Sequence, residues 1–305
     1  MSGITTLLVL GASQSTPLLL ACLGGLLSES SGVINFALEG MMLTGAFMAV
    51  WATHATGSPW AGLLAGAAAG MAVGIVHAVV CLGFRAHQIV SSIALNLLAA
   101  GLTAALVNHV FGVYGTTPTV SRLPTLGNCL GRLTGAEPPL TGALGSLSVL
   151  VPGALLACLL VWVLLAGTSW GLAIRSCGEN PEAASSTGLK VSWIRFGAVA
   201  AGGVFAGMGG AFLSIGELAH FVELMTQGRG YLAVAALILG RWKPGGALGA
   251  VLLFGFAEAL SQWLAVRWVQ WPPQVFLAFP YVLSLGVLFT SRGRRHGPPS
   301  ALGRL

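Results

Sequence analysis

Residues 60–83 read WAGLLAGAAAGMAVGIVHAVVCLG and contain no charged side chain. A run of about 20 apolar residues is long enough for an α-helix to cross the hydrocarbon core of a bilayer. The glycines Gly62, Gly66, Gly70 and Gly74 recur every four residues, so they share one face of such a helix. Small residues at this spacing let another backbone approach closely. The stretch therefore predicts a membrane helix that packs tightly against its neighbours.

The rest of the chain has the same character. Of its 305 residues, 55% are hydrophobic and 7% are charged, whereas soluble domains carry about 25% charged residues. The sequence predicts an all-α, polytopic transmembrane bundle that forms a single domain over residues 1–305. Apolar runs indicate about 8–10 spans, at 5–27, 33–53, 60–83, 89–111, 146–168, 195–216, 246–266 and 274–291. A ten-residue run, YLAVAALILG at 231–240, predicts one short or half helix near 228–240.

Composition excludes several kinds of chemistry. All eight acidic residues are glutamates, and neither lysine, Lys190 or Lys243, follows a glycine, so no phosphate-binding loop of the G-x-x-x-x-G-K type is present. The five cysteines form no C-x-x-C pair and are interpreted as small packing residues rather than metal ligands or disulfides. We therefore expect no catalytic residues and no metal site. We also expect no nucleic-acid partner, because an excess of arginine in a membrane protein is explained by the orientation of the chain in the membrane.

The basic residues predict how the chain crosses the membrane. If 228–240 is a short crossing, ten lysines and arginines fall on one side and four on the other, and the richer side is cytoplasmic. The N-terminus is then outside and the C-terminus inside a cell membrane. This orientation makes 113–145 an extracytoplasmic loop, 169–194 a cytoplasmic loop and 292–305 a flexible cytoplasmic tail.

A few polar residues interrupt the apolar runs. Asn35 and Glu39 lie four apart and would share a helix face, and Glu258 lies near the middle of its span. A carboxylate inside a membrane must face water or a partner, so both glutamates either line a polar path or bond between helices. Asn96 is favoured as a bond between helices, although it remains a candidate for the path lining. Arg229 is the one cation near that lining, and the two glutamates look isolated, which favours a neutral cargo.

The most hydrophilic stretch, GENPEAASSTGLKVSWIRF at 178–196, lies between two long spans. Asn180 can cap a helix, Pro181 suits its first position, Glu182 its first turn, and Gly188 can end it. The stretch predicts a short helix at the cytoplasmic face. Small residues would let a partner surface approach it: Ala183, Ala184, Ser185 and Ser186.

The pattern E-N-P-E-A-A-x-x-x-G from Glu179 to Gly188 resembles the coupling loop of ABC importer permeases. GVINFALEGMMLTGAFMAV, at 32–50, and MTQGRGYLAVAALILGRWKPGGALGAVLLFGFAEAL, at 225–260, resemble the early and late signatures of permeases of the branched-chain amino acid and ribose type. Both stretches are most similar to the signatures of the nucleoside and simple-sugar branch of these permeases. The resemblance covers about residues 30–290, apart from the 113–145 loop.

The resemblance implies that this chain binds no cofactor and that ATP is used by partner ATPase subunits. Its coupling helix, from Glu179 through Asn180, Pro181, Glu182, Ala183 and Ala184 to Gly188, would sit in a groove of the ATPase. A second permease chain, identical or more plausibly different, would complete the path, and an extracytoplasmic binding protein or lipoprotein would deliver the cargo. The alternative is a secondary transporter driven by an ion gradient, with broken helices at 33–50 and 228–249. A membrane enzyme has no support, because no H-E-x-x-H motif or Ser-His-Asp set is present.

Overall fold

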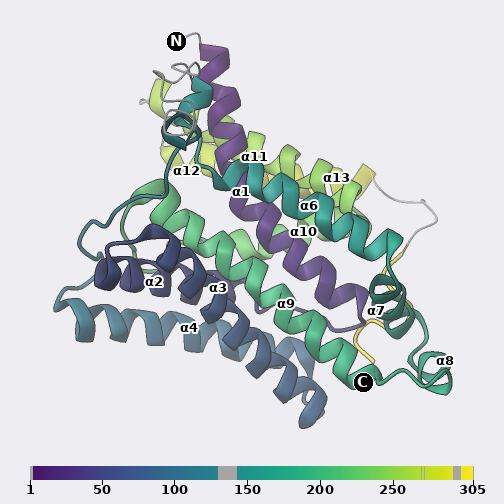
Figure 1. Ribbon diagram of the computed structural model, residues 1–305. Helices are drawn as coiled ribbons and strands as arrows, with labels where there is room; N and C mark the ends of the chain where they lie inside the picture. The colour runs from purple at the N-terminus through teal and green to yellow at the C-terminus, as the bar shows by residue number, and fades with distance from the viewer. Residues whose placement is uncertain (1–2, 130–142, 269, 271, 291–296, 305) are drawn as a thin grey trace.

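The computed structural model describes residues 3–129, 143–268, 270, 272–290 and 297–304 (Figure 1). Within these residues the regular secondary structure is helical, and β-pairing is limited to the isolated bridges Thr116–Val222 and Thr125–Ser148. The predicted all-α, polytopic bundle is therefore confirmed.

Six helical segments of the described residues are long and apolar enough to span a membrane. They are α1 (Gly3–Ser30), α3 (Pro59–Ala78) with the π-helix η1 (Val79–Gly83), α4 (Gln88–Phe111), α6 (Leu150–Gly167), α9 (Val191–Ala211) with the π-helix η3 (Phe212–Leu218), and α11 (Pro244–Arg267). The change from α-helix to π-helix at Phe212 directly follows the glycines at 207, 209 and 210.

Two of the predicted runs differ from the observed helices. The run at 33–53 becomes α2 (Leu38–Thr56), because residues 33–37 form a loop whose backbone N–H groups bond to α4: Ile34 to Gln88 at 2.6 Å and Phe36 to Ser92 at 3.2 Å. The run at 274–291 is divided into α12 (Pro273–Leu277) and α13 (Phe279–Thr290). Pro280 causes this break, because it has no N–H and its ring would clash with the preceding helical turn.

The short run is α10 (Arg229–Leu239), as predicted from its length. Isolated helices of this size are marginal in water, so their stability depends on tertiary contacts. Leu232, Ala233, Val234, Ala236 and Leu237 are buried, and they pack α10 between α1 and α11.

The glycine-rich faces hold α2, α3 and α9 in backbone contact. A Cβ atom on Gly70 would lie 2.3 Å from the carbonyl oxygen of Gly203, and one on Gly207 would lie 2.3 Å from that of Gly66. Gly62 faces α2 instead, where a Cβ would meet Ala49 O at 2.6 Å, and Gly74 faces α9 at Val199 O, at 3.0 Å. No side chain larger than hydrogen fits at Gly70 without separating the helices.

The expected loop at 113–145 has ordered structure in its first part. Thr117 N–H bonds to Phe221 O at 3.0 Å, Val120 N–H to Ala219 O at 2.7 Å, and Leu123 N–H to Ile215 O at 2.9 Å. This segment therefore runs along residues 215–223, at the end of η3. Residues 130–142 lie outside the described part of the chain.

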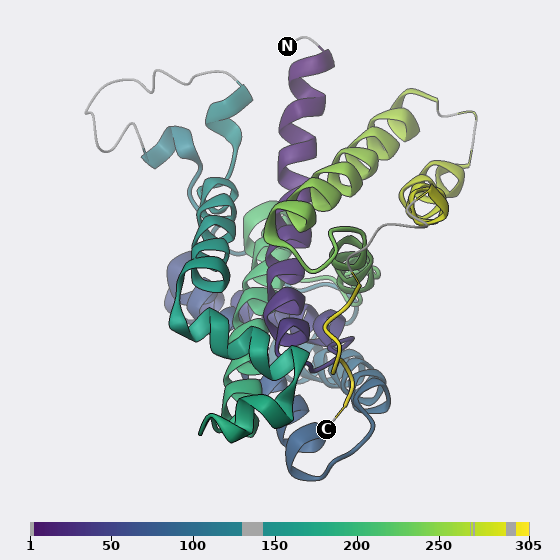
Figure 2. The same ribbon diagram turned by 90° about the vertical axis from the view of Figure 1, so that its right-hand side faces the viewer.

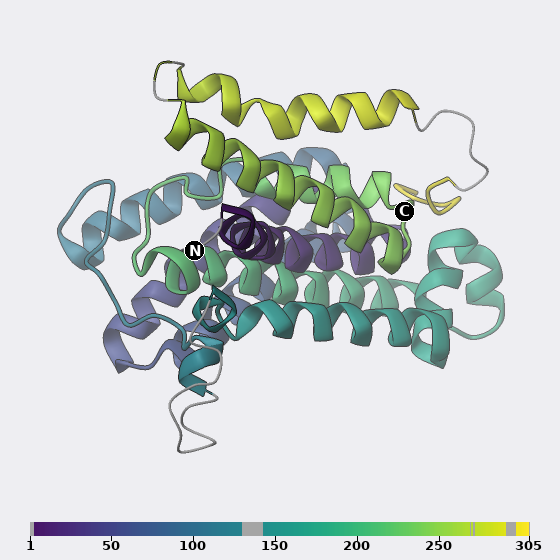
Figure 3. The same cartoon turned by 90° about the horizontal axis from the view of Figure 1, so that it is seen from above.

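One end of the bundle carries the predicted short helix and the C-terminal residues. Here α7 (Ser169–Glu179), α8 (Pro181–Ser186) and residues 297–304 lie together, far from the N-terminus (Figures 1 and 2). We call this the α8 end. Seen from above, α1 runs between α6 on one side and α11 with α13 on the other (Figure 3).

Candidate functional site

The start of α10 is held by Glu39, near the beginning of α2. The two carboxylate oxygens of Glu39 accept hydrogen bonds from Gly228 N–H at 2.8 Å and Gly230 N–H at 2.7 Å. The first N–H groups of a helix have no partner within the helix, and its N-terminus attracts negative charge. Gly230 permits this approach, because a Cβ there would lie 2.4 Å from Glu39 N.

Arg229, the first residue of α10, joins α10 to α1 and α11. Its guanidinium forms an ion pair with Glu258 of α11 and donates to Gln14 Oε1 of α1 at 3.1 Å. Gln14 Nε2 in turn bonds weakly to Glu217 of η3 at 3.4 Å and to Gln262 at 3.5 Å. Side chains from α1, η3, α10 and α11 thus meet in one polar cluster.

This convergence corrects the expectation that Glu39 and Glu258 are isolated. Both carboxylates bind at the start of α10: Glu39 at Gly228 and Gly230, and Glu258 at Arg229. Gln14 and Glu217 were missed, although Glu217 is one of only eight acidic residues and directly follows the predicted 195–216 span. We define the polar cluster as Gln14, Glu39, Glu217, Arg229 and Glu258.

The polar cluster retains unused bonding capacity. Among the described residues, Arg229 Nε and Glu258 Oε2 are buried and have no hydrogen-bond partner. Buried polar atoms of native proteins are nearly always satisfied, by protein, water or ligand. The polar cluster therefore contains one donor and one acceptor that no described side chain satisfies. No group of three or more metal-ligating side chains occurs in the described residues.

The two candidate asparagines have structural partners. Asn35 is fully buried in the loop before α2, where its amide donates to Ser28 Oγ at 3.0 Å. It lies outside α2, so the expected helix face shared with Glu39 does not exist. Asn96 accepts from Gly40 N–H at 2.8 Å and donates to Phe36 O at 2.9 Å and to the Tyr231 hydroxyl at 2.8 Å. It therefore bonds α4 to α2 and to the first turn of α10.

A second site is the exposed helix α8. The side chain of Asn180 accepts from Ala183 N–H at 3.0 Å, Pro181 is the first helical residue, and Gly188 adopts a left-handed φ of 86° after the helix. The structure thus has the short helix that the sequence predicts. Ala184 is buried and anchors the helix, whereas Glu182, Ala183, Ser185 and Ser186 are exposed.

The C-terminal residues are packed against the α8 end, which corrects the expectation of a flexible tail. Ala301 N–H bonds to Gly178 O at 2.9 Å, and Gly303 N–H bonds to Gly32 O at 3.0 Å. Ser300 Oγ donates to Glu179 Oε2 at 2.8 Å. The expected tail at 292–305 thus includes a packed segment at 297–304, while 291–296 lie outside the described residues.

Arg195 of α9 joins these segments from inside. Its guanidinium donates to three carbonyl oxygens: Ser31 at 3.0 Å, Cys177 at 3.1 Å and Arg304 at 2.8 Å. Only 3% of Arg195 is exposed. One buried cation of α9 therefore bonds to three other chain segments: the α1–α2 loop, α7 and the C-terminal residues.

Comparison with known proteins identifies a family. Residues 7–288 match the family described as "Branched-chain amino acid transport system / permease component". The guanosine ABC transporter permease NupQ of Bacillus subtilis is 36% identical, over 93% of this chain and 91% of that protein. The putative glucose ABC transporter permease TsgC13 of Haloferax volcanii is 35% identical, over 99% and 97%, and the nucleoside ABC transporter permease NupC of Lactococcus lactis is 33% identical, over 98% and 96%.

A second guanosine ABC transporter permease of Bacillus subtilis, NupP, matches less closely, with 26% identity over 79% of this chain and 70% of that protein. No solved structure matches significantly.

Proposed function

The chain belongs to the family of branched-chain amino acid transport permease components, and we propose that it is the membrane-spanning permease subunit of an ATP-driven ABC importer for a nucleoside or simple sugar. It is a multi-pass membrane protein and a transport subunit rather than an enzyme. The similarity to nucleoside and glucose permeases supports this cargo class. The ion-gradient alternative receives no support from the family.

The observation that carries the proposal is the exposed, capped helix α8 between two membrane helices. ATP hydrolysis takes place in partner ATPase subunits, and α8 with its flanking residues, Glu179 to Gly188, docks on them. Ala184 fixes the helix to the bundle, while its exposed small side chains leave room for a facing groove. The proposed orientation places the α8 end in the cytoplasm and the N-terminus outside.

The polar cluster at the start of α10 forms part of the path. Its formal charges are three glutamates and one arginine; Arg229 is paired with Glu258, and the carboxylate of Glu39 is held by two helix N–H groups. The free Arg229 Nε and Glu258 Oε2 offer one donor and one acceptor, as a ribose or a nucleobase requires. A neutral polar solute with an apolar face fits this environment better than a strong ion does.

The path requires further chains. Two different guanosine permeases of one bacterium both match this sequence, which favours pairing with a second, different permease over a homodimer. An extracytoplasmic binding protein or lipoprotein would deliver the cargo to the end of the bundle opposite α8.

The docking role is tested with Glu182→Lys and Gly188→Pro. Proline cannot adopt the positive φ of Gly188, and lysine opposes the helix dipole at Glu182. We expect both variants to reach the membrane, yet to lose ATPase co-purification and uptake. Arg267→Gln is the control, because it also changes a charge but lies at the end of α11 far from α8. This variant should retain ATPase co-purification and uptake. Normal ATPase binding by the two α8 variants would rule out this docking role.

The cargo is tested in vesicles that contain the complete importer. Labelled uridine, ribose, leucine and a nucleoside monophosphate are offered separately. We expect uptake of uridine or ribose, because the polar cluster offers one free donor and one free acceptor but no free cation for a phosphate. Uptake of the monophosphate alone would contradict the neutral-solute assignment.

A further inference from the structure

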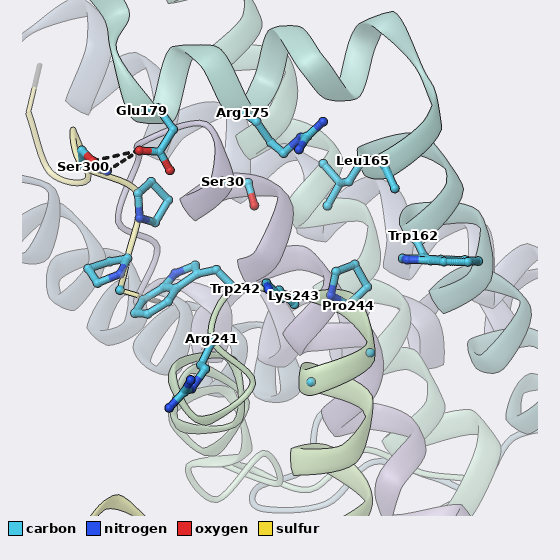
Figure 4. Close-up of a pocket in the computed structure, with 16 residues that line it drawn as sticks. Ser30, Trp162, Leu165, Arg175, Glu179, Arg241, Trp242, Lys243, Pro244 and Ser300 are labelled. Atoms are coloured by element: carbon cyan, nitrogen blue, oxygen red, sulfur yellow. Dashed lines mark hydrogen bonds between the residues drawn. The ribbon is translucent and has the colours of Figure 1, made fainter. Parts of the chain in front are cut away.

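A cavity of about 750 Å³ opens at the α8 end of the bundle. Figure 4 shows α6 and α7 on one side of it, with the turn from α10 to α11 on the other. Residues 297–300 form a third wall. Ligand pockets of proteins commonly enclose about 300–1,000 Å³, so this cavity can hold a molecule of moderate size.

The charged side chains of the cavity are mostly cationic. Arg175, Arg241 and Lys243 line it together with a single carboxylate, Glu179. That carboxylate is already engaged by Ser300, through N–H at 3.2 Å and Oγ at 2.8 Å. Within the described residues the three cations have no ion-pair or hydrogen-bond partner of their own. The cavity therefore has an unbalanced positive charge.

The first turn of α11 adds to this positive field. Pro244, Gly245 and Gly246 line the cavity, and α11 extends over 24 residues from Pro244 to Arg267. The N–H groups at the start of a long helix have no internal partner and favour an anion.

The α10–α11 turn is built in an unusual conformation. Arg241 and Trp242 both have positive φ, 57° and 53°, which costs roughly 1–2 kcal/mol for each non-glycine residue. Trp242 Nε1 donates to Glu29 Oε2 at 2.6 Å, and Glu29 is buried. This anchor holds the strained turn in place, so Arg241 and Lys243 stay at the cavity wall.

The opposite wall continues into an apolar surface. Trp162 of α6 lines the cavity, yet 53% of this residue is exposed. The large side chains that precede and follow it on the exposed face of α6 are all apolar: Leu155, Leu156, Leu159, Leu160 and Val163. A ligand that bridges both environments must carry a negative group at one end and hydrocarbon at the other.

We propose that this cavity binds the phosphate group of an anionic phospholipid from the leaflet at the α8 end, with the acyl chains lying along α6. Arg175 and Lys243 hold the phosphate from opposite walls, the start of α11 contributes N–H donors, and Trp162 packs at the glycerol level. Tryptophan favours this depth, because its ring is amphipathic. Basic side chains near a membrane surface attract anionic lipids. The proposal rests on the membrane placement of the chain and is independent of its cargo.

The complete importer is purified in mild detergent and titrated with phosphatidylglycerol or phosphatidylcholine, and bound lipid is counted by native mass spectrometry. The double substitution Arg175→Gln with Lys243→Gln should reduce phosphatidylglycerol affinity about thirtyfold and leave phosphatidylcholine unchanged. Lys190→Gln, an exposed lysine outside the cavity, is the matched control and should bind like the parent. The single substitution Arg175→Lys keeps the positive charge and should retain most of the parent's affinity for phosphatidylglycerol.

Several results would overturn the assignment. Unchanged phosphatidylglycerol binding in the double variant would show that the lipid binds elsewhere. Displacement of the lipid by inorganic phosphate alone would identify a site for soluble anions. Loss of ATPase co-purification with lipid binding intact would make the cations a protein contact. If the double variant is not monodisperse, Lys243→Gln alone, at an exposed position, decides the question by the same titration. Because binding is counted directly, a failed uptake assay has no bearing on this outcome.

Discussion

Replacement of Arg195 by methionine should release the C-terminal residues and loosen the α8 end. Methionine retains most of the side-chain volume but removes all three donors. The bonds to Ser31, Cys177 and Arg304 are charge-assisted, and such bonds each contribute about 1.5–3 kcal/mol. Ser31 and Cys177 are fully buried, whereas Arg304 is exposed and can bond to water.

The magnitude follows from these burials. Two buried carbonyl groups lose their donor, at about 1–3 kcal/mol each, and removal of a buried guanidinium offsets part of that cost. We expect the local opening free energy to fall by about 2–4 kcal/mol, which speeds amide exchange of the opening segment by roughly 30- to 900-fold. The amides that report it are Ala301, bonded to Gly178 O, and Gly303, bonded to Gly32 O.

Hydrogen–deuterium exchange with mass spectrometry on the purified complex measures this effect. Peptides that cover 297–304 and 30–36 should exchange faster in Arg195→Met, while α11 peptides keep their parent rates. Arg195→Lys, which keeps the charge but cannot reach three carbonyls at once, should give an intermediate rate. Identical exchange of the 297–304 peptide in parent and Met variant would refute this account of the buried cation.

Two further predictions concern packing and orientation. Gly70→Val should prevent the close approach of α3 and α9 and abolish the monodisperse folded species in size-exclusion chromatography, whereas Gly101→Ala, where a Cβ meets no atom within 4 Å, should not. Native Cys177 is a poor topology probe, because it is fully buried and burial raises the pKa of its thiol. In a cysteine-free background, an impermeant thiol reagent on intact cells should label Tyr114→Cys, an 81% exposed position, and spare Thr187→Cys. The reverse pattern would invert the orientation.

Hydropathy was sufficient to predict most of the helices, because a bilayer demands long apolar runs that fold locally. The short α10 and the capped α8 were also predictable, since length, Asn180 and Gly188 are local signals. The loop before α2 was not, because its backbone is satisfied by Gln88 and Ser92 of another helix. Nothing in residues 33–37 themselves indicates that these partners exist.

The candidate site was predicted only in part, for the same physical reason. Glu39 and Arg229 were singled out as polar residues in apolar runs, but 189 residues separate Glu39 from its partner Gly228. Which side chains meet at the start of α10 depends on how α1, α2 and α11 pack. The docking of the C-terminal residues on Gly32 and Gly178 is equally non-local, so composition alone suggested a flexible tail.

The attachment of α10 explains how an 11-residue helix can hold a fixed position in the bundle. Its N-terminus is bound by the carboxylate of Glu39, from α2, and the turn after its C-terminus is bound through Trp242 to Glu29, from α1. Glu29 lies two residues before Ser31, whose carbonyl Arg195 binds. A movement of Arg195 would therefore displace the α1–α2 loop, to which it is bonded. That loop connects α1 and α2, whose residues Glu29 and Glu39 hold the two ends of α10. The polar cluster and the α8 end are thus connected through hydrogen bonds and the chain segments between them, and not by apolar packing alone.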